Sequence, residues 1–249
     1  VEGRGLFERA SDGEVTKADE SPVMLAIFLP MGVMMFMFMV IMMSAQPMLE
    51  SVLEEKTNRI AEVLLGSASP SQIMMGKLLG NVAASLTVVT IYVAGGFALA
   101  TYKEVIDVVP MHLLPWFVVF QVLAVLMFSS LFLAIGSTVS QLKEAQSLLM
   151  PVWILIVTPM FVWFNIVREP NGALATTMSF IPPLTPMLMC LRMAATSSVP
   201  LWQPILGLVL MLITTSIAVF AAGRIFRIGM LSSGRAPKLT EMVKWAITG

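Results

Sequence analysis

The densest charge cluster of the chain is EEKTNRIAEVLLGSASPSQIMMGKLLG, residues 54–80, and it lies between two long apolar runs. Both runs reach the roughly 20 residues that an α-helix needs to cross a bilayer. The charges of the cluster belong in water, yet its apolar residues recur at helical spacing. The stretch therefore predicts two membrane-crossing helices joined by a structured segment outside the membrane.

The composition of the whole chain agrees with this interpretation. Of its 249 residues, 57% are hydrophobic and 12% are charged, whereas soluble domains carry about 25% charged residues. The net charge of zero, one cysteine and one histidine favour neither a nucleic-acid partner nor a multi-Cys or multi-His metal site. We predict an all-α, polytopic helical membrane protein with no metal or cofactor of its own. Its five spans are predicted at about 23–47, 73–102, 113–139, 149–167 and 202–226.

The distribution of Lys and Arg predicts the orientation, because cytoplasmic loops carry an excess of these residues. Nine fall on one side of the spans and six on the other. The richer, cytoplasmic side holds Lys56, Arg59, Lys77, Lys143, Arg224, Arg227, Arg235, Lys238 and Lys244, and the outer side holds Arg4, Arg9, Lys17, Lys103, Arg168 and Arg192. Residues 1–22 are then an extracytoplasmic segment, 23–226 the transmembrane domain and 227–249 a basic cytoplasmic tail. Since a chain that starts outside needs a way across, we expect a further span upstream.

The apolar segment 170–200 does not fit a sixth span. Pro182, Pro183 and Pro186 divide it into pieces of about ten residues, which are too short to cross alone. Arg192 at the centre of a bilayer would cost about 2.5–3.5 kcal/mol. We therefore predict a re-entrant helical hairpin on the outer side, buried by other helices, with Thr185 capping its second helix.

The segment between the first two predicted spans forms an elbow, 48–72. Residues 47–65 read as an amphipathic helix that continues out of the first span, with an i,i+4 pair between Glu55 and Arg59. Ser69-Pro70-Ser71-Gln72 has the pattern of a capping box with proline at the first helical position. The two features predict a helix–turn–helix that projects from the membrane.

A slightly longer form of the opening stretch resembles a known family. VLEEKTNRIAEVLLGSASPSQIMMGKLLG, residues 52–80, is similar to the cytoplasmic loop of type-2 ABC (ATP-binding cassette) exporter permeases, especially their sodium-efflux-like branch. FIPPLTPMLMCLRM and FRIGMLSSGRAPKLTEMVKW resemble the outer hairpin and the basic tail of that family. The elbow positions that match the loop pattern, and that we expect to couple to an ATPase subunit, are Glu54, Glu55, Lys56, Arg59, Glu62, Ser69, Pro70, Gly76 and Lys77.

The resemblance implies a function as well as a fold. A complete family member has six spans, so this chain looks like the C-terminal part, without the first span, of a multi-pass protein of a bacterial or archaeal inner membrane. It would be the permease of an exporter, working as a dimer of permease chains among membrane lipids. A separate ABC ATP-binding subunit would bind ATP and Mg and push the elbow, so that the spans alternate access while the outer hairpin closes the far end.

Two alternatives to this function differ in what the chain itself must do. ATP binding by a phosphate loop needs G-x-x-x-x-G-K-[ST], but Gly76-Lys77 is preceded by Ser71 in the first glycine position and followed by Leu78. We therefore expect no enzyme activity in this chain.

An ion-coupled secondary carrier or a channel-like protein stays open, although the spans offer neutral groups such as Gln121 instead of buried carboxylates. The methionine-rich run at 31–48 suits either a soft substrate path or a lipid-facing surface, and Na⁺, lipid, peptide and drug remain candidate substrates.

Overall fold

The computed structural model describes most of the chain. The described residues are 7–9, 15–17, 20–58, 60, 66, 68–102, 111–196, 198–231, 237 and 239–248. Two members of the predicted elbow set, Arg59 and Glu62, lie outside these residues. The same holds for much of the predicted outer segment 1–22 and for part of the predicted tail 227–249.

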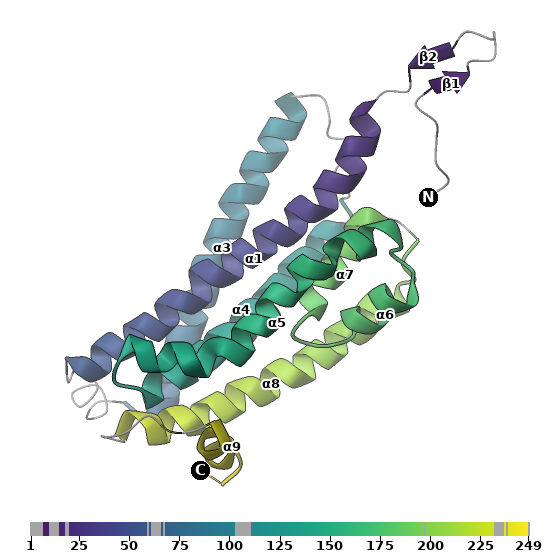
Figure 1. Ribbon diagram of the computed structural model, residues 1–249. Coiled ribbons are helices and arrows are strands. Elements are labelled where there is room, and N and C mark those ends of the chain that lie inside the picture. Colours follow the sequence, from purple (N-terminus) through teal and green to yellow (C-terminus); the bar gives the residue numbers. More distant parts are fainter. Residues whose placement is uncertain are drawn as a thin grey trace.

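Helices make up nearly all of the described structure, and five of them are long and apolar enough to span a membrane (Figure 1). The all-α fold with five spans is therefore confirmed. The five are α1 (Glu20–Thr57), α3 (Pro70–Tyr102), α4 (Leu113–Thr138), α5 (Leu142–Arg168) and α8 (Trp202–Leu231). The shorter elements are β1 (Phe7–Arg9), β2 (Val15–Lys17), α6 (Ala173–Ser179), α7 (Thr185–Ala195) and α9 (Leu239–Thr248).

The predicted spans 73–102 and 113–139 lie within three residues of α3 and α4 at both ends, whereas the other three spans are shorter than their helices at one end. α1 continues ten residues past the predicted end at 47, and α5 begins seven residues before the predicted start at 149. Hydropathy marks only the apolar part of a helix, whereas capping and tertiary contacts decide where the helix itself ends. We call the end of the bundle that holds Thr57, Pro70 and Leu231 the elbow end, and the opposite end, with α6 and α7, the hairpin end.

α4 forms the centre of the bundle. In its most apolar 18-residue window 72% of the residues are buried, compared with 17–33% for the other four spans. It lies against both α1 and α8 along much of its length, with Phe120, Phe128 and Phe132 fully enclosed. The approach to α1 is close because Gly136 has no side chain: a Cβ there would lie 3.0 Å from the carbonyl oxygen of Leu49. Small residues at such contacts are the usual means of bringing membrane helices together.

α6 and α7 form the helical hairpin that the sequence predicts between the fourth and fifth spans. Nine of the eleven residues of α7 are buried, against α1, α4, α5 and α8. Pro182 and Pro183 occupy the turn, where they offer no N–H to a continuing helix. The predicted cap is wrong. Leu184 precedes the first turn, and the Thr185 hydroxyl donates back to the carbonyl of Ile181 at 3.0 Å, because the backbone already turns there.

A pair of short strands precedes the spans in the chain, and a short helix follows them. β1 pairs antiparallel with β2, with Phe7 opposite Lys17. α9 lies beside α8 at the elbow end, where the guanidinium of Arg224 donates to the carbonyls of Ala246 and Ile247 at 3.1 and 2.6 Å. A cation at the last carbonyls of a helix is favourable because it opposes the negative end of the helix dipole.

Candidate functional site

The predicted elbow is built from two helix ends at the same end of the bundle. α1 runs through Pro47 without a break and ends at Thr57, and α3 begins at Pro70. The capping box is confirmed: the Ser69 amide donates to Gln72 Oε1 at 3.0 Å, and the Gln72 amide donates to Ser69 Oγ at 3.4 Å. Two otherwise unpaired N–H groups are satisfied in this way, which fixes the first turn of α3.

An ion pair ties these two helix ends together. Lys77 Nζ lies 2.6 Å from Glu55 Oε1 and donates to Ser51 Oγ at 2.6 Å. The two charged side chains are only 17% and 20% exposed, so solvent screens the pair less than it would at an open surface. Glu55 therefore has a partner on α3, whereas its predicted partner Arg59 lies outside the described residues.

Lys56, the next residue along α1, fastens the elbow to the core. Its ammonium donates to the carbonyl of Ser137 at 2.8 Å and to the carbonyl of Gly229 at 3.0 Å, near the ends of α4 and α8. Both carbonyls lie at the negative ends of helix dipoles, where a cation is stabilising. The helices also approach closely at this point, since a Cβ on Gly229 would lie 2.6 Å from Ser137 Oγ. One side chain thus holds three helices at their ends.

The predicted coupling residues consequently fall into two groups. Glu54, Ser69 and Gly76 are exposed at the surface. Glu55, Lys56 and Lys77 are engaged inside the protein, and Pro70 is the first residue of α3. The surface group is available to a partner, and the internal group connects that surface to α3, α4 and α8.

At the hairpin end, Arg192 is the largest fully buried side chain. Its Nε donates to the carbonyl of Pro170 at 2.6 Å, and its two terminal nitrogens donate to Ser179 Oγ at 2.6 Å and to Gln203 Oε1 at 2.6 Å. A longer bond of 3.4 Å reaches Thr176 Oγ1. Arg192 therefore joins the α5–α6 turn, α6, α7 and α8 through neutral acceptors. Burial of a cation is tolerated here because each acceptor lies where the guanidinium fork can reach it.

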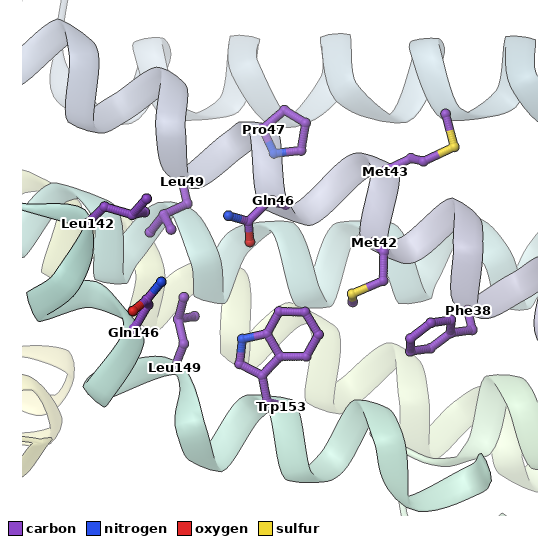
Figure 2. A pocket seen from close by; sticks show the side chains of 10 residues that line it. All are labelled: Phe38, Met42, Met43, Gln46, Pro47, Leu49, Leu142, Gln146, Leu149 and Trp153. Carbon is purple, nitrogen blue, oxygen red and sulfur yellow. The ribbon is translucent and has the colours of Figure 1, made fainter.

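A cavity of about 620 Å³ opens between α1 and α5, and two methionines of the methionine-rich run, Met42 and Met43, line it (Figure 2). Side chains of the two helices point toward each other across it, with Met42 and Gln46 opposite Gln146 and Trp153. No lining residue is charged. The lining consists of Phe38, Met42, Met43, Gln46, Pro47 and Leu49 from α1 and Leu142, Gln146, Leu149 and Trp153 from α5.

Polar groups deeper in the spans are few. Asn81 donates to Ser129 Oγ at 2.7 Å and to the carbonyl of Ser44 at 3.2 Å, so it joins α3 to α4 and α1. Gln121 is buried with no hydrogen-bond partner among the described residues. Within the described ranges no three His, Cys, Asp or Glu side chains gather as metal ligands would.

Comparison with known proteins identifies the family. A family model described as "ABC-2 family transporter protein" matches residues 14–224. This chain belongs to the ABC-2 transporter family. Its five apolar helices make it a membrane component of that type of transporter.

Two curated relatives resemble this ABC-2 chain over most of its length. It is 31% identical over 228 residues to the uncharacterized protein MJ1024 of Methanocaldococcus jannaschii, covering 92% of this chain and 56% of that protein. It is 28% identical over 212 residues to the uncharacterized protein YhaP of Bacillus subtilis, covering 80% of this chain and 50% of that one. The chain thus spans about half the length of the curated relatives it matches. No solved structure matches it significantly.

Two connections in this ABC-2 protein do not follow from the sequence pattern. Lys56 was expected to meet a partner subunit, yet it bonds to residues 81 and 173 positions away. Arg192 was expected only as a charge that keeps the hairpin out of the bilayer. The sequence does contain a signal for two of its hydrogen-bond partners, since Thr176 and Ser179 lie three residues apart on one face of a helix. The third side-chain partner, Gln203, is brought to Arg192 only by the fold.

Proposed function

We propose that this chain is the membrane-spanning permease of an ABC exporter, driven by ATP hydrolysis in a separate nucleotide-binding subunit. One observation carries the proposal beyond family membership: Lys56 and Lys77 fasten the end of α1 to α3, α4 and α8. A force applied to the exposed residues of the elbow would therefore act on four spans at once. ATP and Mg would be bound by the partner and not by this chain.

The elbow suits such a role because one part of it is exposed and another part is bonded to the bundle. Glu54 and Ser69 are exposed. Glu55 is paired with Lys77, and Lys56 donates to two backbone carbonyls. A helix that continues unbroken from the membrane to Thr57 transmits displacement along its axis better than a flexible connector does. We infer that the exposed group meets the ATPase subunit and that the internal group relays its movement.

The cavity between α1 and α5 is the proposed wall of the transport path. One chain forms only half of an enclosure there, so we infer that a second permease chain faces this surface and that the two move to open alternate sides. Thioethers adapt their shape easily, which suits a surface that repacks during the cycle. The cavity has no acidic lining residue, so its chemistry favours an apolar or amphipathic substrate over a bare Na⁺ ion, which prefers oxygen ligands.

The hairpin held by Arg192 is the proposed closure of the outer end. Its placement outside follows from the excess of Lys and Arg on the elbow side. The elbow would then be cytoplasmic, as would the tail, in the inner membrane of a bacterium or archaeon.

This topology can be tested by cysteine labelling of intact cells. Ser140 and Asn171 are exposed near opposite ends of the bundle. The natural Cys190 gives little background, because it is fully buried and burial raises the pKa of its thiol. A cysteine at 140 should react only from the cytoplasm, and one at 171 only from outside. Reaction of position 171 from the cytoplasm would overturn the orientation.

The partner can be tested by purification. The tagged full-length protein should bring with it, in equimolar amount, a subunit that carries a phosphate-binding loop, and the ATPase activity of that subunit should depend on the permease. Substrate movement by the permease alone in ATP-free liposomes under an ion gradient would instead establish the secondary carrier.

A further inference from the structure

A second groove lies on a different face of the bundle, between α3 and α8 with α4 as its floor. Its volume is about 910 Å³, in the range of small-molecule sites. The walls are apolar and partly exposed: the exposed fractions of Met75, Leu79, Leu212 and Phe220 range from 41% to 64%. It shares no lining residue with the cavity between α1 and α5.

One end of this groove is positively charged. Arg224 and Arg227 line it together with Ser69 and Ser71, and none of its lining residues is acidic. Arg224 is committed to the carbonyls of α9 and stacks on Phe220, with 4.7 Å from Cζ to the ring centroid. Arg227 is exposed, and no hydrogen-bond or ion-pair partner for it occurs in the described part of the chain. The first turn of α3, at the same end, adds the positive pole of a 33-residue helix.

Farther along, the groove contains an unsatisfied polar group. Thr215 lines it and is only 4% exposed, and its hydroxyl has no hydrogen-bond partner among the described residues. A buried hydroxyl without a partner costs free energy, so a ligand with an acceptor at this depth would be favoured. Apolar walls, one internal donor and a cationic end together match a molecule with an acyl chain, an ester and an anionic head.

α9 indicates where this cationic end lies relative to the membrane. It is a short helix beside the end of α8, with Val243 and Ile247 exposed at 60% and 69% and with the charged residue Lys244 between them. Amphipathic helices of this kind lie in the plane of the interface, at the level of the lipid headgroups. The Arg227 end of the groove is then at headgroup depth, and the apolar walls extend into the hydrocarbon.

We propose that the groove between α3, α4 and α8 binds an anionic phospholipid, with the phosphate at Arg227 and an acyl chain along α3 and α8. This proposal does not rest on the transport function, because it concerns binding on a face away from the proposed path. A bound lipid would connect the first turn of α3, next to the elbow, to α8.

The test is lipid retention by the purified full-length protein in equal amounts of phosphatidylglycerol and phosphatidylcholine, followed by dilution in lipid-free detergent and quantification of what remains bound. Wild type should retain phosphatidylglycerol preferentially. Arg227→Gln should lower that retention about fivefold, as expected for one basic residue near an anionic headgroup, and Arg227→Lys should keep most of it.

A matched control removes an arginine from the other end of the bundle. Arg168 is exposed, as Arg227 is, but it does not line the groove, so Arg168→Gln should leave phosphatidylglycerol retention unchanged. Equal loss in both variants, or equal retention of the two lipids by wild type, would mean that only unspecific annular lipid is bound and would overturn the proposal.

The position of the lipid is tested separately. A photoreactive benzoyl-phenylalanine at Leu212, which is exposed in the groove, should cross-link to phospholipid in the membrane. A cross-link to a polypeptide would show that another helix fills the groove, and the lipid site would be wrong.

Discussion

Each end of the bundle contains one basic side chain that joins several helices, but the two side chains are bonded differently. At the elbow end, Lys56 is partly exposed and makes two bonds to backbone carbonyls. At the hairpin end, Arg192 is fully buried and reaches four acceptors in two helices and a turn. Lysine bonds to carbonyls near water can be exchanged for bonds to water, whereas buried acceptors that lose a guanidinium stay unpaired.

This difference indicates which end can move. Rearrangement at the elbow end replaces a few solvent-accessible hydrogen bonds, whereas rearrangement at the hairpin end leaves buried polar groups without a hydrogen-bond partner. We infer that the hairpin end is the fixed part of the bundle and that the elbow end is the part on which a partner acts. The predictions that follow test this contrast.

Loss of Arg192 should have the largest effect. Arg192→Ala should lower the free energy of unfolding by about 3–5 kcal/mol, because it removes the donor of several buried acceptors and leaves a cavity. Arg192→Lys should recover part of this loss. Denaturation of the purified protein in mixed micelles measures both variants. A loss under about 1 kcal/mol for the alanine variant would contradict the inference that the hairpin end is the fixed part of the bundle.

The second-largest loss of stability is expected where α4 and α8 approach closely at the elbow end. Gly229→Ala should destabilise the protein by about 2–3 kcal/mol, since overpacking forces the helices apart where a Cβ would lie 2.6 Å from Ser137 Oγ. Gly223→Ala on the same helix is the control. Its Cβ would meet Met74 Cε at an ordinary 3.4 Å. Thermal unfolding should separate the two variants, and equal melting temperatures would contradict the contact.

Lys56 should contribute less than Arg192. Lys56→Met keeps the apolar stem but loses both carbonyl bonds, and we expect a loss of about 1–2 kcal/mol in the same denaturation experiment. Its partners lie on α4 and α8, so hydrogen exchange should rise at the ends of those helices. If Lys56→Met and Arg192→Ala cost the same free energy, the contrast between the two ends fails.

The Glu55–Lys77 pair should have the smallest effect on stability. A double-mutant cycle with Glu55→Gln and Lys77→Gln should give a coupling energy of about 0.2–1 kcal/mol, as for other incompletely buried pairs. Added salt should lower it. A coupling energy of zero at low salt would mean that α1 and α3 are not tied at the elbow.

Local features of this fold could be predicted from sequence, and connections between distant segments could not. The spans follow from apolar length, and the capping box at Ser69 and Gln72 depends on neighbours three residues apart. Glu55 shows the limit: the i,i+4 rule points only to neighbours such as Arg59, which lies outside the described residues, and it cannot point to Lys77 on another helix, 2.6 Å away. The close approaches at Gly136 and Gly229 depend on helix packing that no single segment encodes.

The central claim is that the exposed side of the elbow receives force from an ATPase subunit, and two glutamates on α1 test it directly. Glu54 and Glu50 are both exposed, one helical turn apart, but Glu54 directly precedes Glu55 and Lys56, whereas Glu50 lies one turn farther from the end of α1. In the reconstituted complex with its ATPase subunit, Glu54→Lys should abolish the stimulation of ATP hydrolysis by the permease, and Glu50→Lys should leave it intact. Full stimulation with Glu54→Lys, or equal loss in both variants, would contradict the coupling role of the elbow.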